Sequence, residues 1–171
     1  MADPHIKSEM DWLDYLTVIT YRLGFILAVP SILLLPWEAE TGFPALKACY
    51  VAATMCACCL HIYMKSFRLL LQAATWGGLV CYVLGFGMFG LGGAFITLGG
   101  LCFKEYFCFK VPGLRAQPVI LAALWFALVF DFEPVAQVLA AASALLFLIV
   151  SIAKWRMPLH FDIGDKTKFE V

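Results

Sequence analysis

The chain has 171 residues, of which 63% are hydrophobic and 14% are charged, and its 12 basic and 12 acidic side chains cancel. A soluble domain is about 45–50% apolar and about 25% charged, and a chain this short has too little interior to bury so much apolar surface. The composition therefore excludes an ordinary soluble domain and predicts an integral membrane protein in contact with the lipid bilayer. The balanced charge gives no reason to expect a nucleic-acid partner.

Six apolar runs follow one another along the chain, separated by short loops. A membrane helix needs about 20 mostly apolar residues, so we expect an all-α integral membrane protein with six transmembrane helices in a compact bundle. In this scheme residues 15–154 form the transmembrane domain, 1–14 a polar N-terminal segment and 155–171 a cytoplasmic C-terminal tail. The six predicted spans cover residues 15–37, 44–64, 67–86, 91–107, 117–132 and 134–154.

The loops between these runs differ in the sign of their charge. In or beside the loops on one side lie Glu38, Glu40, Asp131 and Glu133, and those loops contain no Lys or Arg. Most of the basic residues fall in the loops of the other side and in the two terminal segments. Because Lys and Arg favour the cytoplasmic side, we expect both termini to be cytoplasmic in a multi-pass protein of the bacterial inner (plasma) membrane.

Small residues recur at four-residue spacing in two of the predicted spans. Such stripes let helix backbones approach closely in lipid, where no water drives association. We therefore expect the third and the sixth predicted helices each to make a close approach to a neighbour. The stripes are Ala73, Gly77, Cys81 and Gly85 in the third span, and Ala136, Ala140 and Ala144 in the sixth.

Four ionisable residues fall at one depth, in the cytoplasmic half of the predicted spans or at its boundary: Arg22, His61, Lys104 and Glu105. Ionisable side chains in membrane segments are costly and usually face an interior or a water-filled cavity. These four are therefore candidates for a shared polar site, in which Arg22 pairs with Glu105 and His61 relays protons. The alternative is that each side chain extends to the interface and is solvated there. For Lys104 and Glu105 the sequence leaves both orientations open.

The run MCACCLHIYM, residues 55–64, contains soft metal ligands. Cys58, Cys59 and His61, together with Cys102 on another predicted helix, are weak candidates for binding copper or zinc. A zinc site usually has a second ligand pair at a recognisable spacing, whereas Cys102 and Cys108 stand six residues apart. We therefore expect no metal and no other cofactor. Since the sequence also has no catalytic triad or phosphate-binding loop, we do not expect an enzyme.

Four short stretches resemble the patterns of one membrane family: YRLG at 21–24, HIYMK at 61–65, FKEYFCF at 103–109 and FDIGDKTKFE at 161–170. It is a domain-of-unknown-function family of small integral membrane proteins in cyanobacteria, plastids and proteobacteria. The resemblance implies a multi-pass membrane protein and supplies no activity. It also implies that the residues to mutate first are Arg22, His61, Lys104, Glu105, Cys108 and Asp165.

Three functions are compatible with these features. The favoured one is a non-catalytic membrane subunit or assembly factor, because the loops are short and no catalytic constellation is present. Its partner would be another membrane protein or a second copy of the chain, and the tail residues Asp162, Asp165 and Lys166 are candidates for docking. The alternative is a small-solute or ion transporter or channel that uses the four ionisable residues. The third is a membrane metal or redox protein that uses the cysteines.

Overall fold

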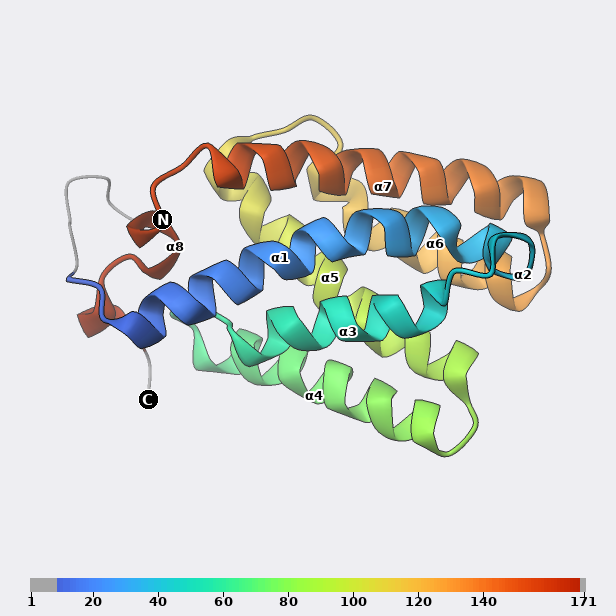
Figure 1. Cartoon of the computed structure of the whole chain (residues 1–171), viewed down its shortest axis with the longest axis horizontal. Helices are drawn as coiled ribbons and strands as arrows, with labels where there is room; N and C mark the ends of the chain where they lie inside the picture. The colour runs from blue at the N-terminus through green and yellow to red at the C-terminus, as the bar shows by residue number, and fades with distance from the viewer. Residues whose placement is uncertain (1–8, 170–171) are drawn as a thin grey trace.

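The computed structural model describes residues 9–169, so the first eight residues of the predicted N-terminal segment and the last two of the tail lie outside it. Within the described residues all regular elements are helical and no strand occurs, which confirms the all-helical prediction. Six long helices form the bundle (Figure 1). They are α1 (Trp12–Leu34), α3 (Ala45–Cys58), α4 (Lys65–Val83), α5 (Gly87–Phe109), α6 (Gln117–Val129) and α7 (Glu133–Trp155).

Short elements connect and extend these helices. The single turn η1 (Leu35–Trp37) and α2 (Glu38–Thr41) follow α1, and η2 (Leu114–Ala116) precedes α6. After α7 the chain forms α8 (His160–Ile163) and η3 (Lys166–Lys168). The start of α1, α8 and the loop between α3 and α4 lie at one end of the bundle, which we call the α8 end (Figure 1). The turn containing α2 and the start of α7 lie at the opposite end.

The helix α5 occupies the centre of the bundle and packs against α3, α4, α6 and α7. Around it, α1 packs against α3 and α7, and α6 packs against α7. Two buried polar pairs join neighbouring helices: the hydroxyls of Thr75 in α4 and Thr97 in α5 are 2.6 Å apart, and Gln117 in α6 donates to the hydroxyl of Ser143 in α7 at 2.9 Å. Such pairs satisfy polar groups that lipid cannot solvate.

Each long helix corresponds to one of the predicted spans, but the bounds differ. The second span was expected to continue to residue 64, whereas α3 ends at Cys58 and residues 59–64 form a loop. Side chains of α4 stabilise this early end, because Gln72 donates to the carbonyl of Ala57 and Arg68 donates to that of Ile62. His61 therefore lies in a loop, and its expected place inside a helical span is wrong.

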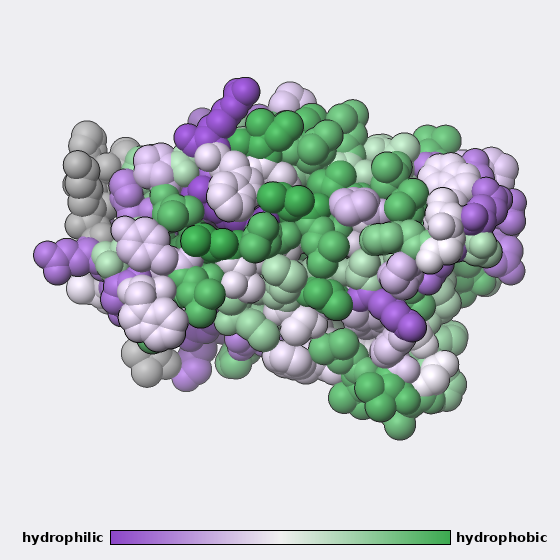
Figure 2. Space-filling view, in the orientation of Figure 1, coloured by the Kyte–Doolittle hydropathy of each residue, from purple (hydrophilic) through white to green (hydrophobic). Residues whose placement is uncertain are grey.

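Three helical segments are long and apolar enough to cross a membrane. They are Trp12–Thr41, Gly87–Phe109 and Glu133–Trp155, while Ala45–Cys58 and Leu114–Val129 are shorter apolar helices. Large hydrophobic side chains face outward along the bundle, among them Val119 and Val138 at 71% and 69% exposure. Hydrophobic residues cover most of the middle of the face in Figure 2, and hydrophilic ones gather toward its two ends. This distribution suits a bundle surrounded by lipid.

The helices α4 and α5 approach each other most closely where glycines meet. A Cβ atom on Gly78 would lie 2.5 Å from the carbonyl oxygen of Gly90, and one on Gly93 would overlap the carbonyl of Ala74. Only glycine permits these backbone contacts. The expected close approach of this helix to a neighbour is therefore confirmed, but it uses Gly78. Gly77, which belongs to the predicted stripe, is exposed, and a Cβ there would meet nothing within 4 Å.

The small-residue stripe predicted for the sixth span is confirmed. Ala136, Ala140 and Ala144 are 2%, 0% and 3% exposed, and they face the interior from α7. This helix contacts α1 and α6, so its small residues lie where two neighbours approach it.

Candidate functional site

Four charged side chains are buried among the described residues, and all belong to the α8 end of the bundle. Arg22, Glu105 and Lys154 are 1–2% exposed and Asp162 is 8% exposed. They come from α1, α5, α7 and α8, respectively. Burying a charge is costly unless it is paired and hydrogen-bonded. The role of the four side chains therefore depends on which groups they pair with.

Asp162 joins the C-terminal segment to two long helices. Its Oδ2 accepts a hydrogen bond from Nε of Arg22 at 2.7 Å and lies 2.6 Å from Nη2 of the same guanidinium. Its Oδ1 accepts a hydrogen bond from Nζ of Lys154. Arg22 also donates from Nη1 to the carbonyl of Met157 at 2.9 Å and from Nη2 to that of Pro158 at 3.1 Å. The planar guanidinium suits such multiple contacts, and it holds the chain after α7 against α1.

Glu105 receives three donors on a single oxygen. Its Oε1 lies 2.8 Å from the hydroxyl of Tyr21, 3.1 Å from Nζ of Lys154 and 3.3 Å from Nζ of Lys104. Lys154 therefore bridges Glu105 and Asp162, and the charges alternate in sign along a continuous chain. We call this chain the charge network: Lys104, Glu105, Lys154, Asp162 and Arg22.

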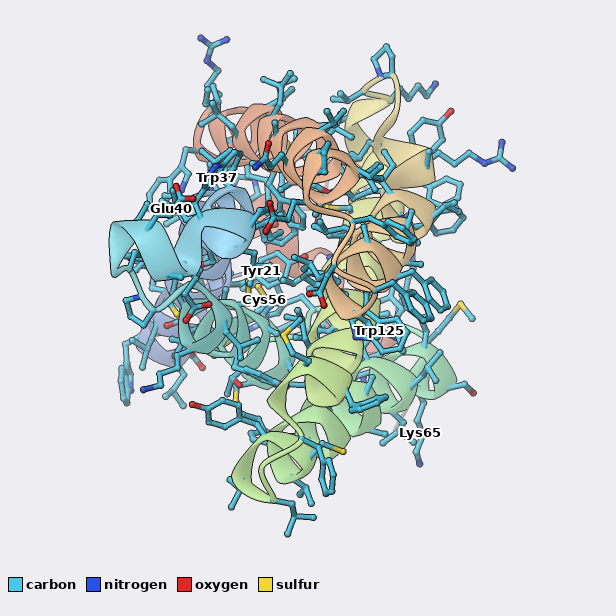
Figure 3. The ribbon with its side chains drawn as sticks, turned by 90° about the vertical axis from the view of Figure 1, so that its right-hand side faces the viewer. Tyr21, Trp37, Glu40, Cys56, Lys65 and Trp125 are labelled. Atoms are coloured by element: carbon cyan, nitrogen blue, oxygen red, sulfur yellow. The ribbon has the colours of Figure 1, made fainter. Side chains whose placement is uncertain are left out.

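Aromatic rings complete the surroundings of the buried cations. Nζ of Lys154 lies 4.8 Å from the ring centre of Tyr21, and Nζ of Lys104 lies 5.2 Å from it. Cζ of Arg22 lies 5.9 Å from the ring centre of Trp155. Tyr21 lies among the helices beside Cys56, whose thiol donates to the Tyr21 carbonyl (Figure 3). Tyr21 thus contacts the network twice, through its hydroxyl and through its ring, and cation–π attraction adds to the stabilisation of both lysines.

His61 lies beside the charge network without joining its ion pairs. It belongs to the loop between α3 and α4, and its Nε2 is 3.3 Å from the hydroxyl of Thr17 in α1. Burial lowers the pKa of His61, and the positive charge of Lys104 acts in the same direction. The imidazole therefore prefers its neutral form in the folded protein.

The segment after Asp162 also contacts the α8 end. The backbone N–H of Asp165 donates to the hydroxyl of Tyr63 at 2.7 Å, and the rings of Tyr63 and Phe169 are 4.9 Å apart. Lys166 pairs with Asp14 of α1, which raises the pKa of that lysine. Hydrogen bonds from Thr167 lower the pKa of Asp165. Of the three tail residues predicted for docking, Asp165 and Lys166 thus lie near the surface, whereas Asp162 is turned into the bundle.

Three of the four ionisable residues predicted from the sequence, Arg22, Lys104 and Glu105, belong to the charge network, but their ion-pair partners differ from those expected. The expected ion pair between Arg22 and Glu105 is wrong, because Arg22 pairs with Asp162 and Glu105 pairs with Lys154 and Lys104. Glu105 faces the interior, while the Lys104 side chain is 24% exposed. Lys154 was missed as a site residue, because a lysine at the end of an apolar run is typical of a solvated helix end.

The four weak metal candidates do not form a site. Cys58 is exposed at the end of α3, Cys102 is buried in α5, and the cysteines are free thiols. Across residues 9–169 no group of three or more His, Cys, Asp or Glu side chains is arranged to hold a metal ion.

Comparison with known proteins agrees with a membrane location. Residues 79–171, which include four members of the charge network, match the model of a family described as uncharacterized integral membrane protein (DUF2301). A Haemophilus influenzae protein named "Uncharacterized protein" is 54% identical over 171 residues, covering 100% of both chains. The chain belongs to this family of integral membrane proteins. The resemblance drawn from the sequence is thereby confirmed. No solved structure matches the chain.

Proposed function

We propose that this protein is a non-catalytic subunit or scaffold of an assembly in the bacterial inner membrane. The proposal rests on one observation: the buried charges of the network are paired with other groups of the same chain. Asp162 accepts from Arg22 and Lys154, and Glu105 accepts from Tyr21 and two lysines. These contacts fix the segment after α7 across one end of the bundle, where it offers a rigid surface to a partner.

We further propose six membrane spans with both termini in the cytoplasm. The sorting of charges supports this orientation, because Glu38, Glu40 and Glu133 lie at the end opposite α8. The basic residues Lys65, Arg68, Lys110 and Arg156 lie toward the α8 end, the side expected to be cytoplasmic.

The helices α3 and α6 are too short to cross a bilayer by themselves. At 1.5 Å per residue a helix of 14 residues is about 21 Å long, whereas the hydrocarbon core is about 30 Å thick. Flanking apolar residues extend α3, since Leu60 and Ile62 in the following loop are buried at 9% and 7% exposure.

To test the scaffold proposal, the protein is purified at native expression level in a mild detergent, and the proteins that co-purify with it are identified by mass spectrometry. We expect the wild type to co-purify with a stoichiometric membrane protein. Asp162→Asn, which weakens the attachment of the C-terminal segment, should lose this partner. Glu133→Gln, at the opposite end, is the matched control and should keep the partner. Wild-type protein that purifies without a stoichiometric partner would overturn the proposal.

A second candidate function is ion transport, favoured by the Glu105–Lys154 pair within the helical part of the bundle. Ionisable pairs at such depth mark ion and proton pathways in many membrane proteins. The test is proton flux into proteoliposomes loaded with a pH-sensitive dye. Transport predicts flux that Glu105→Gln abolishes and Glu40→Gln, an exposed carboxylate at the opposite end, leaves unchanged. Wild-type vesicles no more permeable to protons than empty ones would exclude this candidate.

A further inference from the structure

A cavity of about 340 Å³ lies beside the charge network. Its walls come from the loop between α3 and α4, the last turns of α5 and the segment that contains α8. A water molecule occupies about 30 Å³ in the liquid, so the cavity has room for about ten non-hydrogen atoms. Most of its wall is apolar, and the main apolar side chains are Ile62, Met64, Phe107, Met157, Phe161 and Ile163.

The charge network contains one more cation than anions, and the surplus faces this cavity. Arg22 and Lys154 are fully buried and lie against Asp162 and Glu105. Lys104 shares the Oε1 atom of Glu105 with two closer donors, and its own N–O distance of 3.3 Å is the longest of the three. Its side chain lines the cavity and is 24% exposed. An entering anion would therefore meet an ammonium group whose charge is only partly compensated.

The other titratable groups that line the cavity do not cancel the positive charge of Lys104. Glu105 and Asp162 line the cavity, but Glu105 already contacts Tyr21 and Lys154, and Asp162 already accepts from Arg22 and Lys154. His61 contributes a polar edge, and Cys108 lies on the exposed side. The cavity thus combines a single available cation with an apolar wall.

We propose that this cavity binds an anionic amphiphile. Its negatively charged head, a carboxylate or a phosphate, contacts Nζ of Lys104, and its apolar body lies among Met64, Phe107 and Phe161. Phe107 and Cys108, near the end of α5, line the cavity and are exposed, so both a membrane lipid and a free amphiphile can reach it. The site does not depend on the scaffold proposal, because a bound amphiphile is compatible with a subunit and with a transporter.

Octanoate is a suitable probe, because its ten non-hydrogen atoms match the volume of the cavity. The full chain is purified in a neutral maltoside detergent, and its thermal unfolding is followed with increasing octanoate. At tenfold the dissociation constant, the midpoint should rise by about 3–6 °C for a chain of this size. Lys104→Gln should abolish the rise, whereas Arg156→Gln, an exposed cation at the same end, should keep it.

A second variant tests the cavity without touching the charge. Cys108→Trp fills the cavity from its exposed side and should also abolish the rise, while the variant unfolds cooperatively. Octylammonium and 1-octanol are the matched probes with a positive and a neutral head. An equal rise with either of them in the wild type, or an unchanged octanoate effect in Lys104→Gln, would overturn the proposal.

Native mass spectrometry then distinguishes the two sources of the ligand. The wild type and Lys104→Gln are released from nanodiscs that contain phosphatidylglycerol. Phosphatidylglycerol retained by the wild type and lost by the variant identifies a lipid head as the ligand. An octanoate effect that depends on Lys104, without retained lipid, identifies a free amphiphile. If neither probe depends on Lys104, the cavity does not bind anions and the inference fails.

Discussion

Arg22 in α1 and Asp162 in α8 form a buried ion pair with 2.6 Å between Nη2 and Oδ2, although 140 residues separate them in the chain. The same carboxylate pairs with Lys154 at the end of α7. The segment after α7 is therefore part of the bundle and not a free tail. Asp162 is the charged side chain of this segment that pairs with two buried cations, and the Arg22 contacts to the carbonyls of Met157 and Pro158 add to the attachment.

Asp162→Asn should weaken the attachment of this segment. Removing one partner of a buried pair leaves an uncompensated charge and typically costs about 3–5 kcal/mol. We expect a lower free energy of unfolding in detergent and faster trypsin cleavage after Arg156. Asp165→Asn is the control, because the Asp165 side chain bonds to Thr167 of its own turn and its loss should leave cleavage after Arg156 nearly unchanged. Wild-type resistance to trypsin in Asp162→Asn would contradict an attachment through Asp162.

Glu105 and Lys154 should show strong coupling in a double-mutant cycle. Glu105→Gln leaves Lys154 with Asp162 alone, and Lys154→Met leaves Glu105 with Lys104 and Tyr21. Glu105→Gln raises the excess of cations in the network from one to two, and Lys154→Met removes a cation in contact with both carboxylates, whereas the double change removes one charge of each sign. We expect the double variant to be more stable than the sum of the singles by about 0.5–3 kcal/mol. The measurement is the free energy of unfolding of the four proteins, and strict additivity would contradict direct pairing.

His61 should make the folded state sensitive to acid. Burial lowers its pKa below the usual value of about 6.5, so between the two values the unfolded chain binds more protons than the folded one. Stability from this residue is therefore fully present above about pH 6.5 and is lost as the pH falls through the lowered pKa. Thermal unfolding between pH 7.5 and 5 should show this loss, and His61→Gln should reduce it. His160→Gln is the control, and an equal pH dependence in both variants would contradict the role of His61.

The sequence predicted what depends on local hydrophobicity and missed what depends on long-range packing. Six helices could be located because each is an apolar run bounded by polar or turn-forming residues. The depth of Arg22 and Glu105 could be estimated from the same runs. Lys154 could not be recognised, because its neighbours Trp155 and Arg156 make it look like any lysine at a helix end. Only the return of Asp162 across the bundle, a contact with no local signal, makes it a buried residue.

The face of a glycine-rich helix illustrates the same limit. Gly77 and Gly78 are adjacent, and regular spacing favoured Gly77, yet the position of α5 selects Gly78. When a helix has small residues on every face, their periodicity does not identify the face that contacts a neighbour. The position of the neighbouring helix determines that face.

These two glycines give a matched pair of substitutions with opposite expected signs. A Cβ at position 78 would lie 2.5 Å from the Gly90 carbonyl oxygen, a backbone atom that moves only with α5, whereas position 77 faces open space. Gly78→Ala should therefore destabilise the bundle by about 1–3 kcal/mol, and Gly77→Ala should stabilise it by up to about 1 kcal/mol through helix propensity. The measurement is unfolding of the two variants and the wild type in the same detergent. Equal stability of the two variants would show that α4 and α5 do not approach each other through Gly78.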